Sequence, residues 1–242
     1  MLTIHNLEVT IDEQIILTDI NLEVGSGEII FLMGKNGSGK STLAQALIGN
    51  PNYSYSGNIQ FQNQDLFQLE MHERSNQGIF VSYQNPVEVA GVNITTYLKE
   101  IINANREANG KNNLGAREIL ELVKAKMQLL KWDNSFLKRN LNEGMSGGEK
   151  KKSEILQMLL LDPKLIVLDE IDSGLDVQAL GEICSVIKSF LNQDKSLIII
   201  THNPKILDYI IPDKVVLLES GKIKLIGKSE LAKQIFDSEF RI

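Results

Sequence analysis

The chain has 242 residues, of which 43% are hydrophobic and 23% charged, a balance typical of a soluble globular protein with one substantial core and room for a subdomain. Its net charge of −6 argues against nucleic-acid binding, which needs a basic face. The longest apolar runs are strand-length and no signal-peptide pattern is evident, so we expect a cytoplasmic protein without direct membrane insertion and without a nucleic-acid partner.

The first predicted elements are strands. Residues 2 to 24 alternate apolar and polar positions around a turn-like Asp12-Glu13 pair, which predicts an antiparallel hairpin. The apolar run Ile29 to Met33 predicts a further strand, and Leu43 to Ile48 a helix. We expect the hairpin to flank whatever ligand the following turn binds.

A glycine-rich turn joins this strand to this helix. Its glycines let successive N–H groups point inward, and the helix adds its positive N-terminal end, so the segment predicts a cradle for the phosphates of a nucleotide. Lys40 is placed to reach the β- and γ-phosphates, Ser41 to ligate Mg²⁺, and Thr42 to support the α-phosphate. The predicted binding residues of this turn are Gly34, Lys35, Asn36, Gly37, Ser38, Gly39, Lys40, Ser41 and Thr42.

In the middle of the chain the predicted secondary structure changes from short strands to helices. Residues 57 to 61 and 78 to 82 resemble short strands, the second followed by Gln84. From Asn93 to Leu160 the apolar spacing becomes helical, with a polar break at residues 109 to 113. We therefore predict an inserted helical subdomain at 93–160 and a catalytic α/β core at 1–92 and 161–242.

A second glycine-rich turn lies inside the predicted helical subdomain. Ser146 and Glu149 have the spacing of a capping box, but Gly147 and Gly148 occupy the first helical turn, where each costs about 1 kcal/mol against alanine. Such a helix start indicates close approach to the backbone by a phosphate, which we expect to be bound to a second copy of the protein. The lysine run at 150–152 is predicted to be a solvated helix face.

Two carboxylates follow the next predicted strand, Leu165 to Leu168. Four apolar residues suit a parallel strand buried on both faces, and its carboxyl end is where open α/β sheets bind ligands. Asp169 is predicted to hold Mg²⁺ through water, and Glu170 to orient or deprotonate the attacking water. The structural alternative is that both acids cap the following turn.

The remaining pattern returns to α/β. A helix is predicted from Val177 to Leu191, where Cys184, the only cysteine, shares an apolar stripe and is expected to be a packed core thiol. His202 follows the strand Leu197 to Ile200, and we predict that it contacts the γ-phosphate. Two more strands are expected at 215–218 and 223–226.

Together these motifs occur in the order found in nucleotide-binding subunits of ATP-binding-cassette proteins, which the chain resembles over its whole length. The resemblance implies a P-loop nucleotide-binding fold with an N-terminal antiparallel β flank and an inserted helical subdomain. It also implies an ATP-dependent homodimer in which two subunits, head to tail, enclose two ATP molecules. Gln84 then corresponds to the glutamine that contacts Mg²⁺, Asp176 to the residue that couples the two sites, and His202 to the switch histidine. Ser146, Gly147 and Gly148 would bind ATP held by the partner subunit.

Within this family the chain most resembles the ATPases of the SUF iron–sulfur cluster assembly system. Four segments carry this resemblance, at residues 83–92, 142–151, 154–158 and 169–176. Transport ATPases commonly have S-G-G-Q where this chain has Glu149, and a proline-threonine pair where it has Ile171-Asp172. The resemblance implies soluble scaffold partners similar to SufB and SufD. Adenine, which family members commonly stack on an aromatic residue, would here meet an aliphatic position near Ile11.

Two other functions stay open from the sequence. The chain could be the motor subunit of a membrane transporter, which has the same ATPase core but an integral membrane partner. It could also be an interaction protein that is gated by ATP and has negligible turnover. Identification of the partner would separate these readings.

Overall fold

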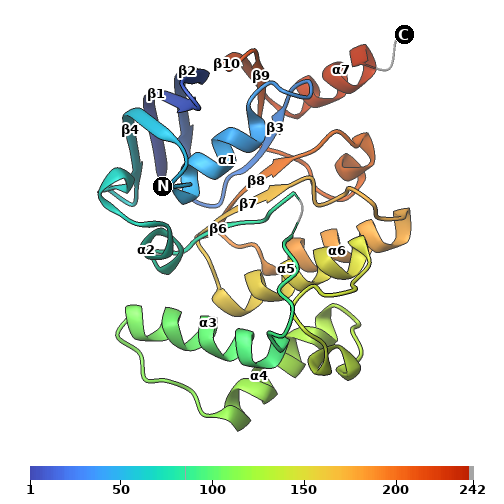
Figure 1. Ribbon diagram of the computed structural model, residues 1–242. Coiled ribbons are helices and arrows are strands. Elements are labelled where there is room, and N and C mark those ends of the chain that lie inside the picture. Colours follow the sequence, from blue (N-terminus) through green and yellow to red (C-terminus); the bar gives the residue numbers. More distant parts are fainter. Residues whose placement is uncertain (85, 240–242) are drawn as a thin grey trace. The chain divides into compact units, whose positions relative to one another are not determined.

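The structure, a computed structural model, describes residues 1–84 and 86–239 (Figure 1). Asn85, within one of the segments that resemble SUF ATPases, and residues 240–242 of the predicted core lie outside the described residues. The chain forms two compact units. The core unit comprises Met1–Gln84, Lys164–Ile171 and Leu191–Ile242, and the helical unit comprises Asn85–Pro163 and Asp172–Phe190.

The first sheet of the core unit is antiparallel. Its strands lie in the order β2-β1-β4-β5. Asp12 and Glu13 adopt positive φ angles of 46° and 64° between β1 and β2, so the predicted hairpin and its turn are confirmed. The strands are β1 (Leu2–Ile11), β2 (Gln14–Val24), β4 (Ser54–Phe61) and β5 (Gln64–Asp65).

The second sheet of the core unit has the order β10-β9-β3-β8-β7-β6. All neighbouring pairs are parallel except β9 with β10. Every residue of β7 and β8 is buried, as their unbroken apolar sequences predict for strands covered on both faces. The strands are β3 (Ile29–Met33), β6 (Ile79–Val81), β7 (Leu165–Asp169), β8 (Ser196–Ile200), β9 (Lys214–Glu219) and β10 (Lys222–Gly227).

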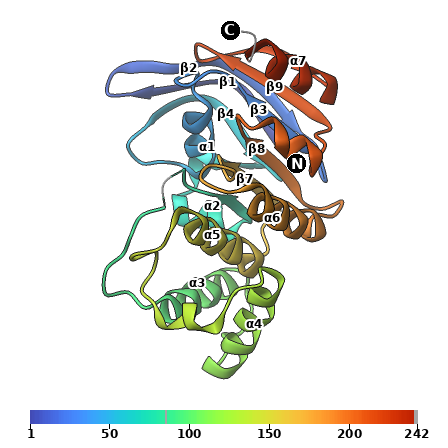
Figure 2. The same cartoon turned by 90° about the vertical axis from the view of Figure 1, so that its right-hand side faces the viewer.

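Helix α1 (Lys40–Ile48), labelled in Figure 2, contributes to a hydrophobic core that also contains residues of both sheets. Leu43, Ala44 and Leu47 belong to the same buried cluster as Ile4 of β1 and Leu32 of β3. The burial of this apolar face fixes the helix, and with it the turn that precedes it, against the parallel sheet. The other short elements of this unit are η1 (Leu66–Gln68), α2 (Met71–Asn76), η3 (Pro204–Asp208) and α7 (Ser229–Glu239).

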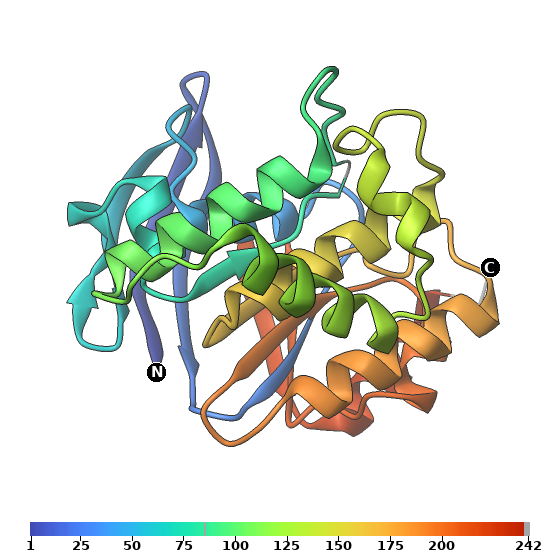
Figure 3. The same cartoon turned by 90° about the horizontal axis from the view of Figure 1, so that it is seen from below.

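The helical unit contains α3 (Ile94–Ala108), α4 (Ala116–Leu129), η2 (Asn134–Lys138), α5 (Gly147–Leu161) and α6 (Val177–Phe190) (green to orange in Figure 3). Its bounds differ from the predicted 93–160, because residues from 86 onward and α6 group with it. Helix α6 joins this unit because it packs against α5. Within residues 1–84 and 86–239, no helix has the length and apolar character needed to cross a membrane.

Two single residues of the helical unit show how its packing compares with the predictions. Cys184 is buried with Leu180 and Ile187, as predicted, and burial raises the pKa of its thiol to about 12. The prediction that the lysine run is solvated was wrong for Lys151. Its side chain is only 5% exposed and its ammonium lies 3.7 Å from the carboxylate of Glu154, because one face of α5 is buried.

Candidate functional site

Two glycines shape the turn between β3 and α1. Gly34 has a φ of 147°, and a Cβ there would lie 2.1 Å from the carbonyl oxygen of Leu218. Gly39, with a φ of 104°, is the residue before the helix, and its Cβ would lie 2.5 Å from a methyl carbon of Leu17. Neither position can accept a side chain without movement of its neighbours. The sequence therefore needs glycine at both positions for the turn to close onto the sheet.

The side chain of Lys40 curls over this turn. Its ammonium donates hydrogen bonds to the backbone oxygens of Gly34 (2.7 Å) and Lys35 (3.0 Å), and the residue is 5% exposed. These oxygens hold the cation over the concave side of the turn. An arriving phosphate would offer the same ammonium charged acceptors, which form stronger hydrogen bonds than neutral carbonyls.

A hollow of about 400 Å³ in the core unit is lined by predicted residues from three separate segments, although Gly34, Lys35, Ser38, Asp169 and His202 are not part of its lining. A volume of this order is typical of small-ligand sites. The glycine-rich turn at residues 34–42, called the phosphate turn below, contributes to it, as do the end of β6 and the end of β7. Its lining residues are Ile16, Asn36, Gly37, Gly39, Lys40, Ser41, Thr42, Gln84 and Glu170.

The sheet explains why these segments meet. Strands β3, β8, β7 and β6 are parallel neighbours in that order, so their carboxyl ends share one edge. Gly34, His202, Glu170 and Gln84 follow these four strands closely in sequence. The edge thus brings together groups that are up to 168 positions apart, from Gly34 to His202.

Glu170 lies at the centre of the polar contacts in this edge. Its backbone has a φ of 49°, and its N–H donates to the carbonyl oxygen of Ile200 at 2.9 Å. One carboxylate oxygen accepts a hydrogen bond of 2.7 Å from the side-chain amide of Gln84. The other lies 3.6 Å from Nε2 of His202. Gln84, predicted to contact Mg²⁺, and His202, predicted to contact the γ-phosphate, therefore both face the predicted base.

The donor set at this edge suits Mg²⁺. Hard cations take hydroxyl, amide and carboxylate oxygens, the groups that Ser41, Gln84 and Asp169 carry. Ser41 and Gln84 line the hollow, and Asp169 ends the buried strand directly before Glu170. The N–H of Asp169 donates to the Ser82 hydroxyl at 2.9 Å, which fixes the end of β7 against β6.

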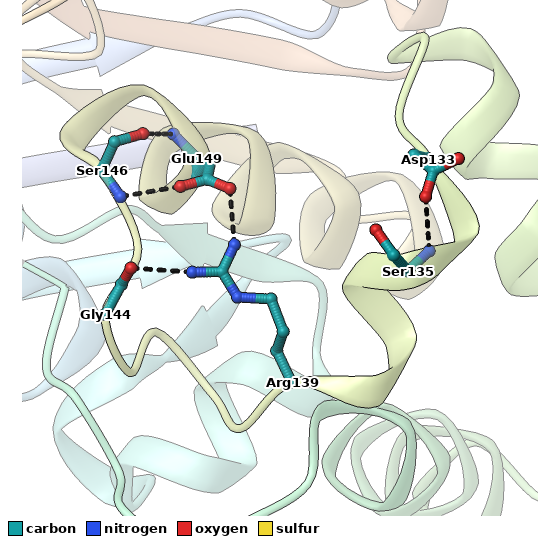
Figure 4. Close-up of polar contacts among 6 residues, drawn as sticks. All are labelled: Asp133, Ser135, Arg139, Gly144, Ser146 and Glu149. Carbon is teal, nitrogen blue, oxygen red and sulfur yellow. Dashed lines mark hydrogen bonds and ion pairs between the residues drawn. The ribbon is translucent and has the colours of Figure 1, made fainter.

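The second glycine turn begins α5 in the helical unit (Figure 4). The predicted capping box is confirmed: the N–H of Glu149 donates to the Ser146 hydroxyl at 3.3 Å, and the N–H of Ser146 donates to the Glu149 carboxylate at 2.8 Å. A Cβ on Gly147 would meet nothing within 4 Å, so no neighbour in the described structure requires glycine there. The open space is what the predicted approach of a phosphate needs.

The carboxylate of Glu149 has a second partner that the sequence analysis missed. Arg139 donates to it at 2.5 Å and to the carbonyl oxygen of Gly144 at 2.8 Å (Figure 4). The pKa of Glu149 is lowered, first by the N–H of Ser146 and further by the hydrogen bond and charge of Arg139, against the opposing effect of burial. A glutamate in a capping box could have prompted a search for a paired cation.

Asp176 and Ile11 show where the structure adds to the predictions. Asp176 precedes α6, and its carboxylate accepts the N–H of Ala179 at 2.8 Å, so it caps this helix. Its coupling role stays a prediction. Ile16, rather than Ile11, lines the hollow, because Ile11 ends β1 and is partly buried against the hydrophobic core.

Comparisons with known proteins found similar sequences and structures. A family model described as ABC transporter matches residues 17–173. The chain is 44% identical over 236 residues to the probable ATP-dependent transporter ycf16 of Cyanophora paradoxa, covering 97% of this chain and 91% of that protein. It is 42% identical over 236 residues to the probable ATP-dependent transporter SufC of Escherichia coli (strain K12), covering 97% and 95%.

Solved structures show the same fold. The ADP conformation of an ATP-binding cassette of an ABC transporter superposes with a TM-score of 0.78 at 25% identity, covering 98% of this chain and 94% of that one. A dimeric, post-hydrolysis ATP-binding cassette bound to ADP and phosphate gives a TM-score of 0.79 at 19% identity, covering 95% and 99%. The predicted fold class is confirmed.

Proposed function

We propose that this chain, which belongs to the ABC transporter family and is an ATP hydrolase, works as a head-to-tail dimer that drives a conformational change in an iron–sulfur cluster assembly scaffold. Its predicted resemblance to SufC is confirmed, and the family binds ATP. The observation that carries the proposal is the single hollow in which the phosphate turn, Gln84 and Glu170 meet.

The residues of the hollow support a division of labour in hydrolysis. Lys40 exchanges its two backbone acceptors for oxygens of the β- and γ-phosphates. Ser41, Gln84 and Asp169 would hold Mg²⁺, which neutralises charge on the phosphates when bound. Glu170 accepts a proton from the attacking water. His202, on the other side of the Glu170 carboxylate, contacts the γ-phosphate.

The second glycine turn, at residues 146–148 and called the signature turn below, completes the site from a second copy. Ser146, Gly147 and Gly148 would meet the γ-phosphate held by the partner's phosphate turn, where the positive end of α5 favours an anion. Asp176 would couple the two sites of the dimer. Hydrolysis then depends on dimer formation, and separate chains pay association entropy that a scaffold holding two copies largely removes.

An exposed apolar segment supports the scaffold partner. Val87 is 71% exposed, and Val89 and Val92 are each more than one third exposed. The segment is hydrogen-bonded to Leu141, which precedes the signature turn, because the N–H of Val89 donates to the carbonyl oxygen of Leu141 (3.0 Å) and the N–H of Leu141 donates to that of Val92 (2.8 Å). The side chain of Asn142 also donates to the carbonyl oxygen of Val87 at 2.9 Å. A partner on these valines would therefore move with the segment that leads into Ser146.

Mixing two inactive variants tests the composite site. Lys40→Ala removes the phosphate-binding lysine, and Ser146→Ala removes the signature hydroxyl, so a mixed dimer would keep one site with both groups. We expect hydrolysis in the mixture above that of either variant alone. A mixture no more active than its parents would contradict the head-to-tail arrangement.

Affinity purification from the source cell tests the partner. We expect soluble proteins similar to SufB and SufD to copurify with the chain. Recovery of an integral membrane permease in their place would support the transporter-motor function, which shares the same ATPase core.

A further inference from the structure

Arg139 has a position in the helical unit that the capping box alone does not explain. It follows η2, whose first turn is capped by Asp133 through the N–H of Ser135 (2.7 Å), as Figure 4 shows. Its own N–H donates to the carbonyl oxygen of Phe136 at 3.1 Å, and its carbonyl oxygen accepts the N–H of Ile94 at 3.0 Å. The backbone of Arg139 is thus held on both sides before its side chain makes any contact.

The guanidinium joins the two ends of the signature turn. One nitrogen donates to Glu149, in the first turn of α5, and another donates to the carbonyl oxygen of Gly144, two residues before Ser146. The other oxygen of the Glu149 carboxylate accepts the N–H of Ser146. The position of the Ser146 backbone is therefore set through one carboxylate and one guanidinium, which we call the signature clamp.

The negative charge of Glu149 gives Arg139 an electrostatic role in addition to its positioning of the turn. A helix N-terminus carries about half a positive elementary charge, whereas a carboxylate carries a full negative one. Without a counter-charge, the start of α5 would repel the phosphate that the proposed dimer brings to it. A glutamine could form the same capping box without this cost.

The neighbouring lysines of α5 have other partners. Lys150 lies 2.8 Å from the carboxylate of Glu88, Lys151 3.7 Å from that of Glu154, and Lys152 4.0 Å from that of Glu182. Arg139 is the cation whose ion pair with Glu149 the structure shows directly, at 2.5 Å. The neutralisation of Glu149 is accordingly assigned to it.

We propose that Arg139 is a positioning residue for ATP hydrolysis, which acts on the partner subunit's ATP by holding Ser146 in place and neutralising Glu149. This inference rests on the proposed composite site. It predicts that the need for Arg139 arises from the charge of Glu149, so the two residues must be coupled energetically. A purely structural arginine would be needed equally whether residue 149 is charged or neutral.

A double-mutant cycle tests this coupling. Because hydrogen bonds to charged groups are strong, Arg139→Ala should lower kcat about tenfold in the Glu149 chain, and less than about threefold in the Glu149→Gln chain. Arg139→Lys, which keeps the charge and loses the two-point contact, should have an intermediate kcat. Equal losses from Arg139→Ala in both backgrounds would overturn the proposal.

Matched controls separate folding from positioning. Arg117 makes an exposed ion pair with Glu121 in the same unit, so Arg117→Ala should leave kcat unchanged. Thermal unfolding identifies any variant that fails to fold. If Arg139→Ala fails to fold, the cycle is run with Arg139→Lys. The loss of kcat caused by Arg139→Lys should likewise be smaller in the Glu149→Gln background than in the Glu149 chain.

Mixing distinguishes this inference from the composite site on which it rests. Arg139→Ala mixed with Lys40→Ala should regain hydrolysis, as Ser146→Ala mixed with Lys40→Ala does, because both changes damage only the signature side. Recovery with Ser146→Ala but not with Arg139→Ala would overturn the clamp alone. If neither mixture recovers, the composite site fails and the clamp fails with it.

Discussion

Glu170 has a left-handed backbone, with a φ of 49°, and its carboxylate is held by the amide of Gln84. A glutamate rarely adopts this conformation, and such residues are concentrated at functional sites. Here the bend ends β7 and brings the side chain to the hollow that Lys40 also lines. The amide of Gln84 occupies one of the two carboxylate oxygens, so binding of Mg²⁺ by Gln84 would change the partners of both residues.

Replacement of Glu170 by glutamine tests its role as the base. The amide keeps the shape of the side chain but cannot accept the proton, so kcat should fall by about 100-fold or more while ATP stays bound. The variant should form an ATP-dependent dimer, detectable by light scattering. Glu230→Gln, on the exposed start of α7, is the matched control. Normal turnover by Glu170→Gln would assign the base to another residue, with His202 the first to examine.

Replacement of Lys40 by alanine tests the phosphate turn. No other side chain in the hollow's lining carries a positive charge, so affinity for ATP should fall by at least about tenfold, the loss expected for a charge-assisted contact. Calorimetry measures this directly. Lys222→Ala, at an exposed position of β10, controls for the loss of a positive charge. Unchanged affinity in Lys40→Ala would refute the assignment.

At the scale of elements, α1 carries the phosphate turn and is held at both ends. Gly39 starts it, and the guanidinium of Arg74 contacts its last turn. Arg74 is 3% exposed and donates to the carbonyl oxygens of Ala46 (2.9 Å), Leu47 (3.3 Å) and Leu69 (3.1 Å). The bonds to Ala46 and Leu47 supply donors at the end of α1, where the last carbonyl oxygens of a helix lack intrahelical ones. Arg74 thereby ties α2 to the helix that positions the site.

Substitution of Arg74 by methionine should therefore destabilise the fold. The apolar side chain keeps much of the length but removes the guanidinium donor from three carbonyl oxygens, of which Ala46 retains the N–H of Gly49, and this costs about 3 kcal/mol in the free energy of unfolding. Urea unfolding measures the loss. Arg117→Met, at an exposed ion pair, should change this free energy by less than about 1 kcal/mol. Similar values for the two variants would show that the buried contacts of Arg74 add little.

At the scale of the whole molecule, the chain divides into a unit that holds the phosphate turn and a unit that holds the signature turn. The exposed valines belong to the helical unit, and their backbone is bonded to residues 141 and 142, just before the signature turn. A scaffold bound there would act on signature residues and leave the phosphate turn of the same chain to bind ATP.

Replacement of both Val87 and Val92 by aspartate tests this surface. The charges should abolish scaffold binding and scaffold-stimulated hydrolysis, because apolar contact area is lost and carboxylates would be buried unpaired. Basal ATP affinity should stay within about twofold, since neither valine lines the hollow. Ile211→Asp, at an exposed apolar position of the core unit, is the control. Full binding and stimulation in the valine variant would exclude this segment as the docking site.

Local sequence patterns determined much of this protein. Glycines at positions 34 and 39, the apolar runs of β3, β7 and β8, and the capping box at Ser146 each predict their structure from a few neighbouring residues. They do so because backbone sterics, the burial of a continuous apolar run and helix capping depend on neighbouring residues in the sequence. Parallel strands then place their polar ends at one edge, so the membership of the site followed from the pattern as well.

Other features depended on the tertiary structure, because their partners are distant in sequence or their spacing has no local signature. The bond between Gln84 and Glu170 spans 86 positions, and Arg74 reaches the carbonyl of Ala46 across 28. Helix α6 groups with the helical unit because of its packing on α5, and Ile16 lines the hollow through the register of the hairpin. Side-chain contacts of this kind form only when separate elements pack. Hydrophobic periodicity and secondary-structure propensity therefore do not predict which residues make each contact.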